Sequence, residues 1–157
     1  MEEIGLKSRS LGRTDYDPRD PLTAIRSLML DSNGLIALAF RKSLIAQGTS
    51  MPNSDLEEKV AEKDWSNQWL SSPWCHIESA MAFQLGLPVL IFREKGVIQD
   101  GMLEKGTFGV YMPEFDLDKD ETGQSYLKSS EFRQLLHEWS SYVRSVARNK
   151  GLPPKLY

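Results

Sequence analysis

The stretch "LSSPWCHIESAMAFQLGLPVLIF", from Leu70 to Phe92, contains the signals of a complete helix and of the strand after it. Ser72 followed by Pro73 is typical of a helix N-cap and the first helical residue. Gly86 is typical of the position just past a helix C-terminus. The apolar run Leu87 to Phe92 lacks polar alternation, which predicts a strand buried on both faces of a parallel sheet. We therefore expect a helix, a tight turn and a buried strand in direct succession.

An equivalent unit stands upstream. Asp20 and Pro21 predict the start of a helix, and the segment "DSNG" from Asp31 to Gly34 predicts its end. "LIALAF", from Leu35 to Phe40, is a second continuous apolar run between turn signals. Helices that alternate with buried strands predict an α/β fold. We expect three αβα layers around a short, mostly parallel sheet of the flavodoxin-like or Rossmann-like class.

Weaker patterns predict further strands and loops. Ile4 to Ser8 has the modest apolar content of a strand, and Thr107 to Met112 predicts a strand near a sheet edge. Residues 41–54 are polar and rich in turn formers, which predicts a loop. The acidic segment "EFDLDKDETGQ" after the third strand predicts a solvated loop.

Two more helices are predicted by capping and periodicity. Ser54 and Glu57 have capping-box spacing, so a short charged helix is expected to about Asp64. The C-terminal helix has the clearest pattern, with a Ser129 or Ser130 cap and apolar residues at i, i+3, i+4 and i+7. These apolar residues are Phe132, Leu135, Leu136, Trp139, Val143 and Val146. The simplest interpretation of this stripe is a core-facing surface, so Trp139 is assigned to packing.

The composition is that of an ordinary globular chain of 157 residues, so we expect one α/β domain over residues 1–157. A net charge of −3 and a pI near 5.5 argue against a general nucleic-acid or membrane binder. No apolar run approaches the roughly 20 residues that cross a bilayer, and the N-terminus lacks the apolar core of a signal peptide. The single cysteine, Cys75, cannot form an internal disulfide, which favours a reducing, cytoplasmic location.

Motifs for metals and cofactors are missing from the sequence. His76 and His137 lie far apart with no second cluster of ligand residues, so no zinc site is expected. Neither a GxGxxG fingerprint nor a Walker sequence occurs, which argues against dehydrogenase-type dinucleotide binding and P-loop chemistry. We therefore expect no resident cofactor.

Three arginines are candidates for an anion site. Ligands of doubly wound sheets bind beyond the carboxyl ends of the strands. Arg41 directly follows one predicted strand, and Arg9 and Arg13 lie in the loop after the N-terminal strand. Together with the helix N-terminus at Ser72 they would form a phosphate site, because guanidinium groups and helix N-termini both attract anions. The alternative is that these loop arginines are simply solvated.

Glu78 is the candidate for chemistry. It shares one face of the predicted helix with Trp74, Ala82 and Leu85, because residues three and four apart lie on the same side. Burial there raises the pKa of a carboxyl group, whereas the dipole of the helix N-terminus lowers it. Glu78 is either a structural residue that pairs with an arginine or caps a backbone group, or a reactive carboxylate. Cys75 is expected to be a small buried hydrophobe.

The opening stretch resembles a motif of TIR domains: a serine, a spacer, tryptophan-cysteine, two spacers and a glutamate, before a small-residue helix and a buried strand. Here these positions are Ser72, Trp74, Cys75 and Glu78. The helix is also similar to that of nucleoside 2-deoxyribosyltransferases, where a glutamate precedes "G-x-A-x-x-x-G-x-P-V". The corresponding residues are Glu78, Ala80, Ala82, Leu85, Gly86, Leu87, Pro88 and Val89. The resemblance covers about Pro21 to Phe92, under half of the chain.

The resemblance implies a nucleotide-processing enzyme that cleaves an N-glycosidic bond: an NAD glycohydrolase or a related N-ribosyl hydrolase or transferase. The glutamate that matches Glu78 is needed in those families to release nicotinamide from NAD, or is the nucleophile on the sugar. Trp74 would stack on a base or ring, and Ser72 would cap the helix. NAD or another nucleotide would be a substrate or ligand. The alternative is a non-catalytic TIR-like module that binds a nucleotide or assembles with like domains, as in defence signalling.

The chain also departs from the TIR pattern. A complete TIR domain begins with an apolar strand and a helix before its arginine-containing loop. This chain begins almost directly with "EIGLKSRSLGRTDY", which resembles the family's second strand and the loop after it. We therefore expect the first βα unit to be missing or replaced, and we expect a homo-oligomer.

Overall fold

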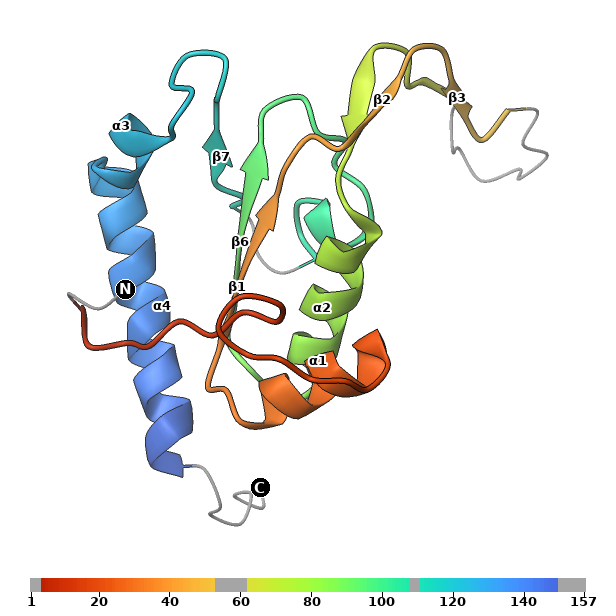
Figure 1. The fold of residues 1–157 in the computed structure, drawn as a ribbon. Helices are drawn as coiled ribbons and strands as arrows, with labels where there is room; N and C mark the ends of the chain where they lie inside the picture. Colours follow the sequence, from red (N-terminus) through yellow and green to blue (C-terminus); the bar gives the residue numbers. More distant parts are fainter. Residues whose placement is uncertain (1–3, 53–61, 108–110, 150–157) are drawn as a thin grey trace.

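Three parallel strands form the central sheet in the described part of the chain, in the order β1–β6–β7 (Figure 1). β1 (Leu35–Ala39) pairs with β6 (Val89–Glu94), and β7 (Glu114–Phe115) pairs with only the last two residues of β6. Both strands predicted from continuous apolar runs are present, although β6 lies two residues further along the chain than expected. The computed structural model describes residues 4–52, 62–107 and 111–149.

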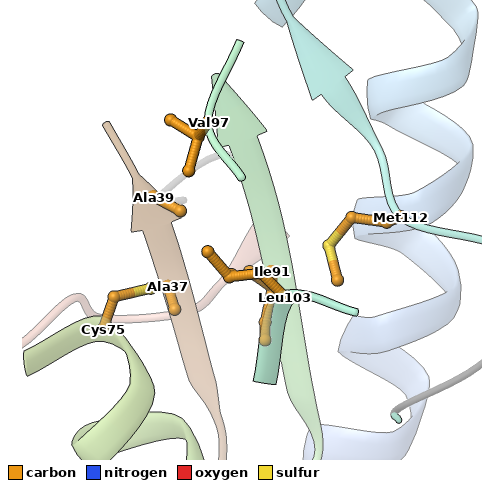
Figure 2. Packing of buried hydrophobic residues seen from close by; sticks show 7 residues of the cluster. All are labelled: Ala37, Ala39, Cys75, Ile91, Val97, Leu103 and Met112. Carbon is orange, nitrogen blue, oxygen red and sulfur yellow. The ribbon is translucent and has the colours of Figure 1, made fainter. Parts of the chain in front are cut away.

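Small side chains on one face of β1 let helix α2 (Pro73–Gln84) lie close against the sheet. Ala37 and Ala39 are buried there beside Ile91 of β6 and Cys75 of α2 (Figure 2). Three residues that follow β6 in the chain complete this cluster: Val97, Leu103 and Met112. The predictions of the helix, of its C-terminal Gly86 with φ 70, and of a buried Cys75 are confirmed.

Helix α1 (Pro21–Leu30) starts where the sequence predicts. The side chain of Asp20 accepts a hydrogen bond, 3.0 Å long, from the backbone N–H three residues later, which is the usual geometry of an N-cap. Ile25 and Met29 pack against Ala82 of α2, so α1 is held by α2 as well as by the start of β1. These contacts form a second apolar cluster at the amino end of the sheet.

Helix α4 (Ser130–Asn149) lies on the other side of the sheet from α1 and α2 (Figure 1). The Ser129 hydroxyl accepts the backbone N–H of Phe132 at 3.1 Å, which confirms the predicted cap. Trp139 is 7% exposed, and its indole N–H donates to the carbonyl of Pro88 at 3.0 Å. The assignment of Trp139 to packing is therefore confirmed.

Gly34 lies where α4 comes closest to the turn before β1. A Cβ atom at this position would be 2.6 Å from Cγ2 of Val143 and 2.9 Å from Cζ2 of Trp139. The sequence identifies this glycine only as part of a helix stop. In the structure its lack of a side chain is what allows the helix to pack directly over the turn.

Two short antiparallel pairs stand beyond the carboxyl ends of β1 and β6 (Figure 1). β2 (Ser43–Ile45) pairs with β5 (Gln68–Leu70), and β3 (Thr49–Ser50) pairs with β4 (Lys63–Asp64). The prediction of a loop over 41–54 is therefore wrong at β2 and β3. The predicted charged helix also does not reach Asp64, which lies in a strand; residues 53–61 lie outside the described part of the chain.

The N-terminal segment does not form the strand predicted at 4–8. Gly5 has a left-handed backbone, φ 70, which interrupts the extended conformation that a strand needs. The carbonyl of Ile4 instead accepts a hydrogen bond from Nη2 of Arg144 at 2.6 Å, so the segment is tied to α4. As a result, β1 is an edge strand among the described residues.

The third predicted strand is also displaced. Thr107 lies in a turn, Tyr111 and Met112 have irregular backbone, and residues 108–110 lie outside the described part. The carbonyl of Pro113 accepts the backbone N–H of Arg93 at 2.9 Å, and β7 begins just after it. Proline has no N–H to donate to a strand ladder, which explains why pairing starts only beyond this residue.

The prediction of an α/β fold with a short parallel sheet is confirmed, and the described part contains four α-helices. One of them, α3 (Gln124–Leu127), is a single turn that begins at the last residue of the acidic segment that was predicted to be a loop. The first two residues of that segment form β7, so the loop prediction is wrong at its start. The flavodoxin-like or Rossmann-like class stays a prediction. Among the described helices, none has the length and apolarity required to cross a bilayer.

Candidate functional site

Glu78 lies in the middle of α2 and is half-buried. Within the described residues its carboxylate makes neither a hydrogen bond nor an ion pair that would compensate this burial. Burial raises the pKa of the Glu78 carboxyl group above its ordinary value. The structural alternative, in which Glu78 pairs with an arginine or caps a backbone group, has no such contact in this part of the chain.

Two residues of the same helix define the surroundings of Glu78. Trp74, one turn earlier, is 39% exposed and stands at the surface beside it. Cys75 is turned into the sheet, and burial together with the nearby Glu78 carboxylate raises the pKa of its thiol to about 11. The thiol is therefore protonated at neutral pH and is no nucleophile. The chemical groups available on this side of α2 are an unpaired carboxylate and an aromatic face.

Ser72 occupies the N-cap position of α2, but its side chain does not cap the helix. Its backbone is extended, and its carbonyl accepts the N–H of Cys75 at 3.0 Å. The N-cap position of Ser72 was therefore predicted correctly, but the capping hydrogen bond expected from its side chain does not form. The first N–H groups of α2 thus receive no side-chain cap from Ser72, and an anion or water could accept hydrogen bonds from them.

Arg41 reaches the carboxyl end of the sheet as predicted, and there its backbone N–H, its Nε and its Nη1 are all bound by neighbouring residues. Its backbone N–H donates to the buried carboxylate of Glu94 at 2.7 Å, and its Nε donates to the carbonyl of Lys95 at 2.6 Å. Nη1 contacts both carboxylate oxygens of Asp118 at 3.0 Å. A phosphate group would have to displace Asp118, whose side chain is 70% exposed, to reach this guanidinium.

Arg9 and Arg13 do not join Arg41. Arg9 pairs with Asp15 at 2.6 Å and lies 3.8 Å from Asp31, which precedes β1 at the amino end of the sheet. Arg13 is exposed on the turn that follows Arg9 in the chain. Leu11 of the same turn packs near Ile25. The predicted convergence of three arginines is therefore wrong, because it depended on an N-terminal strand that does not form.

Sequence reasoning missed the ion pair between Arg93 and Glu114. The Arg93 side chain is 5% exposed; its Nη2 donates to a carboxylate oxygen of Glu114, and its Nη1 donates to the carbonyl of Val97. The run of acidic residues after Pro113 was the available signal. However, pairing between residues 21 positions apart depends on the register of β7, which the sequence does not reveal.

A pocket of about 940 Å³ opens beside this ion pair, beyond the carboxyl end of β6. Glu78 does not line it. Among the described residues, no group of three or more histidine, cysteine, aspartate or glutamate side chains is arranged to hold a metal ion.

Comparisons of the chain with protein-family models, with curated proteins and with solved structures give no match. The function of the chain therefore has to be inferred from its own residues.

Proposed function

We propose that the chain is a TIR-like nucleotide-processing enzyme that cleaves an N-glycosidic bond, with Glu78 as its catalytic carboxylate. The observation that carries this proposal is a half-buried carboxylate without a described partner, one helical turn from an exposed tryptophan. A structural glutamate at such a position would be expected to have a charged or hydrogen-bonding partner. The family resemblance of Ser72, Trp74, Cys75 and Glu78 points to the same chemistry.

The reaction breaks the bond between the anomeric carbon of a ribose and the nitrogen of a base. The base leaves with the bonding electron pair, and positive charge develops on the sugar as an oxocarbenium-like centre. The ionised Glu78 carboxylate would stabilise this centre or bond to it, and a water or an acceptor hydroxyl would then add to the anomeric carbon and lose a proton. Trp74 would stack on the base or sugar of the substrate. NAD is the first substrate to test.

The test is release of free base from NAD and from deoxynucleosides, followed chromatographically with wild type, Glu78→Gln and Glu121→Gln. Glutamine keeps the size of Glu78 but cannot stabilise a cation, so we expect at least about a 100-fold loss of base release. Glu121→Gln removes an exposed carboxylate from a turn and should retain wild-type activity. Equal rates for wild type and Glu78→Gln, with both proteins folded, would remove Glu78 from the mechanism.

A second candidate is a non-catalytic TIR-like module that binds a nucleotide or assembles with copies of itself. It is favoured by the absence of Glu78 from the residues that line the pocket beside Arg93. If this second candidate is correct, NAD should raise the melting temperature of the protein without any release of base. The same assays, run at several protein concentrations to include assembled forms, decide between the two candidates. We also propose that the sheet and its helices form the three αβα layers of the flavodoxin-like or Rossmann-like class.

A further inference from the structure

The face of α4 that looks toward the sheet is only partly covered. A groove of about 770 Å³ lies between this helix, the first half of β6 and the segment 111–113. Its walls are mainly apolar and aromatic, and the end of α2 also contributes to them. The residues that matter below are Val89, Ile91, Tyr111, Leu135, Glu138, Tyr142 and Val146. The apolar stripe of α4 therefore borders an open groove as well as the core.

One edge of β6 is open along this groove. β7 pairs only with Arg93 and Glu94, so the earlier residues of β6 have no described strand on that side. The N–H of Arg93 donates to the carbonyl of Pro113 at 2.9 Å, and alternate residues of a strand bond to the same neighbour. Val89 and Ile91 therefore direct their N–H and C=O groups to the β7 side, where no described strand pairs with them. Backbone groups in an apolar setting normally have partners, so this edge has room for one more extended segment.

The groove combines one charge with exposed aromatic rings. Among the described residues that line it, Glu138 alone is charged, and its exposed carboxylate forms no ion pair in this part of the chain. Tyr111 is 60% exposed and Tyr142 is 56% exposed, so both rings are largely open to solvent. Aromatic-lined grooves bind extended segments that contain proline. The groove thus suits an apolar, proline-containing segment with a basic residue.

Residues 150–157, "KGLPPKLY", have this composition and continue the chain directly from α4; they lie outside the described part. α4 runs against the direction of β6, so a chain that turns back after Asn149 runs beside β6 in the direction of the strand (Figure 1). The groove follows α4 from Leu135 to Val146, which is roughly 16 Å. Eight extended residues span about 25 Å, enough for the groove and for the turn that precedes it.

We propose that residues 150–157 occupy this groove in the same molecule, as an extended segment between β6 and α4. Carbonyl groups of the segment accept the N–H groups of Val89 and Ile91. Proline lacks an N–H but keeps its carbonyl, so a proline-containing segment can still supply these acceptors. The docked segment covers the open edge of β6 and the exposed rings together.

The lengths of helix and segment place the side chains in order. Counted from the end of α4, Pro154 comes level with Tyr142, because the extended segment rises about twice as far per residue as the helix. Lys155 then comes level with Glu138, where opposite charges pair. Glu78 does not line the groove, so the docking is independent of the proposed reaction and goes beyond it.

The test is amide hydrogen exchange of the full chain followed by NMR, together with NOEs from the methyl groups of Leu152 and Leu156. In wild type we expect NOEs from these methyl groups to the ring of Tyr142, and slow exchange of the Val89 N–H. Leu152→Asp/Leu156→Asp places two charges against apolar walls and should speed this exchange at least about 10-fold. The N–H of Leu90 points to β1 and is the internal control, with unchanged exchange expected.

A charge swap tests the pairing of Lys155 with Glu138. Glu138→Lys and Lys155→Glu should each speed the exchange of Val89, and Glu138→Lys/Lys155→Glu should restore the wild-type rate. Lys128→Glu changes an exposed residue outside the groove by the same charge and should behave as wild type. Two destabilised single variants without restoration in the double variant would overturn the pairing.

Other results would overturn the docking itself. Equal exchange of Val89 in wild type and in Leu152→Asp/Leu156→Asp would mean that the segment leaves the edge of β6 uncovered. NOEs seen only between a ¹³C-labelled and an unlabelled copy in a mixed sample would assign the segment to a second copy. If a variant fails to fold, the wild-type NOEs decide. None of these outcomes affects the test of Glu78 by base release.

Discussion

In the described part of the chain, charged residues are paired at the carboxyl end of the sheet, whereas the carboxylate on the Glu78 side of α2 is not. At the sheet end, Arg93 pairs with Glu114, Lys95 pairs with Asp116, and Arg41 contacts both Glu94 and Asp118. On α2, the half-buried Glu78 has no partner among the described residues.

This difference separates two uses of ionisable residues. Paired charges between neighbouring strands fix the position of β7 and of the acidic segment after it, so their removal should cost stability. An unpaired carboxylate contributes little to stability, and its burial is a cost that a structural role does not explain. Mutations at the two places should therefore separate loss of fold from loss of activity.

The largest loss of stability is expected from Glu114→Ala. It leaves the buried guanidinium of Arg93 without its counter-charge, which should cost about 3 kcal/mol in the free energy of unfolding. Arg93→Met should cost less, because the remaining Glu114 is partly exposed and can be hydrated. Urea denaturation of both variants measures the asymmetry. Equal losses would mean that the pair acts only through packing.

Glu78→Gln should have the reverse profile, with activity lost and stability retained. Because the folded-state pKa of Glu78 is raised, the protonated group is the one the fold favours, and its contribution is lost as the pH rises through that pKa. We therefore expect Glu78→Gln to melt slightly higher than wild type at pH 7, with the difference shrinking as the pH falls to 4. Wild-type base release should fall on the acid side at a pH above 4.5, the ordinary value for glutamate. A lower melting temperature at pH 7 would indicate a hidden partner for Glu78.

Arg41→Ala and Arg9→Ala compare a partly buried arginine with an exposed one. The Arg41 side chain is 19% exposed and bridges two segments, so its removal should cost about 1–3 kcal/mol, measured by urea denaturation. Arg9 pairs only with nearby acidic residues at the surface, and its removal should leave stability unchanged within error. A larger loss for Arg9→Ala would show that the N-terminal segment is more firmly attached than its contacts indicate.

The smallest expected effects come from two serines at helix starts. Ser129→Ala removes a real cap of α4 and should cost about 1 kcal/mol. Ser72→Ala removes a side chain that makes no capping bond to α2 and should cost clearly less. Thermal melts of the two variants under one buffer provide the measurement. A comparable loss at Ser72 would mean that its hydroxyl caps the helix in solution.

The elements that the sequence predicts correctly are those whose sequence signals lie within the element itself or directly beside it. The cap at Asp20, the proline at position 73 and the long apolar runs of β1 and β6 each act over one turn or one strand. The two-residue and three-residue strands of the antiparallel pairs are too short and polar for alternation to be visible. Ile4 to Ser8 was mistaken for a strand because a left-handed glycine outweighs weak apolar content.

In the candidate site, too, the features that depend on local sequence were predicted and those that depend on distant contacts were not. The position of Glu78 on α2 follows from helical periodicity, and the arrival of Arg41 at the sheet end follows from its place after β1. The contacts of Arg41 with Glu94 and Asp118 join residues 53 and 77 positions apart. Such pairs depend on how distant elements dock, which local sequence does not encode.

The pairing of β1 with β6 also has a kinetic consequence. Every residue pair in this register joins positions 54 apart, from Leu35 with Val89 to Ala39 with Arg93. The chain must close that long loop before the first ladder hydrogen bonds can repay the entropy of closure, whereas α4 forms from neighbouring residues alone. The rate-limiting event of folding should therefore be the meeting of β1 and β6, after the helices have begun to form.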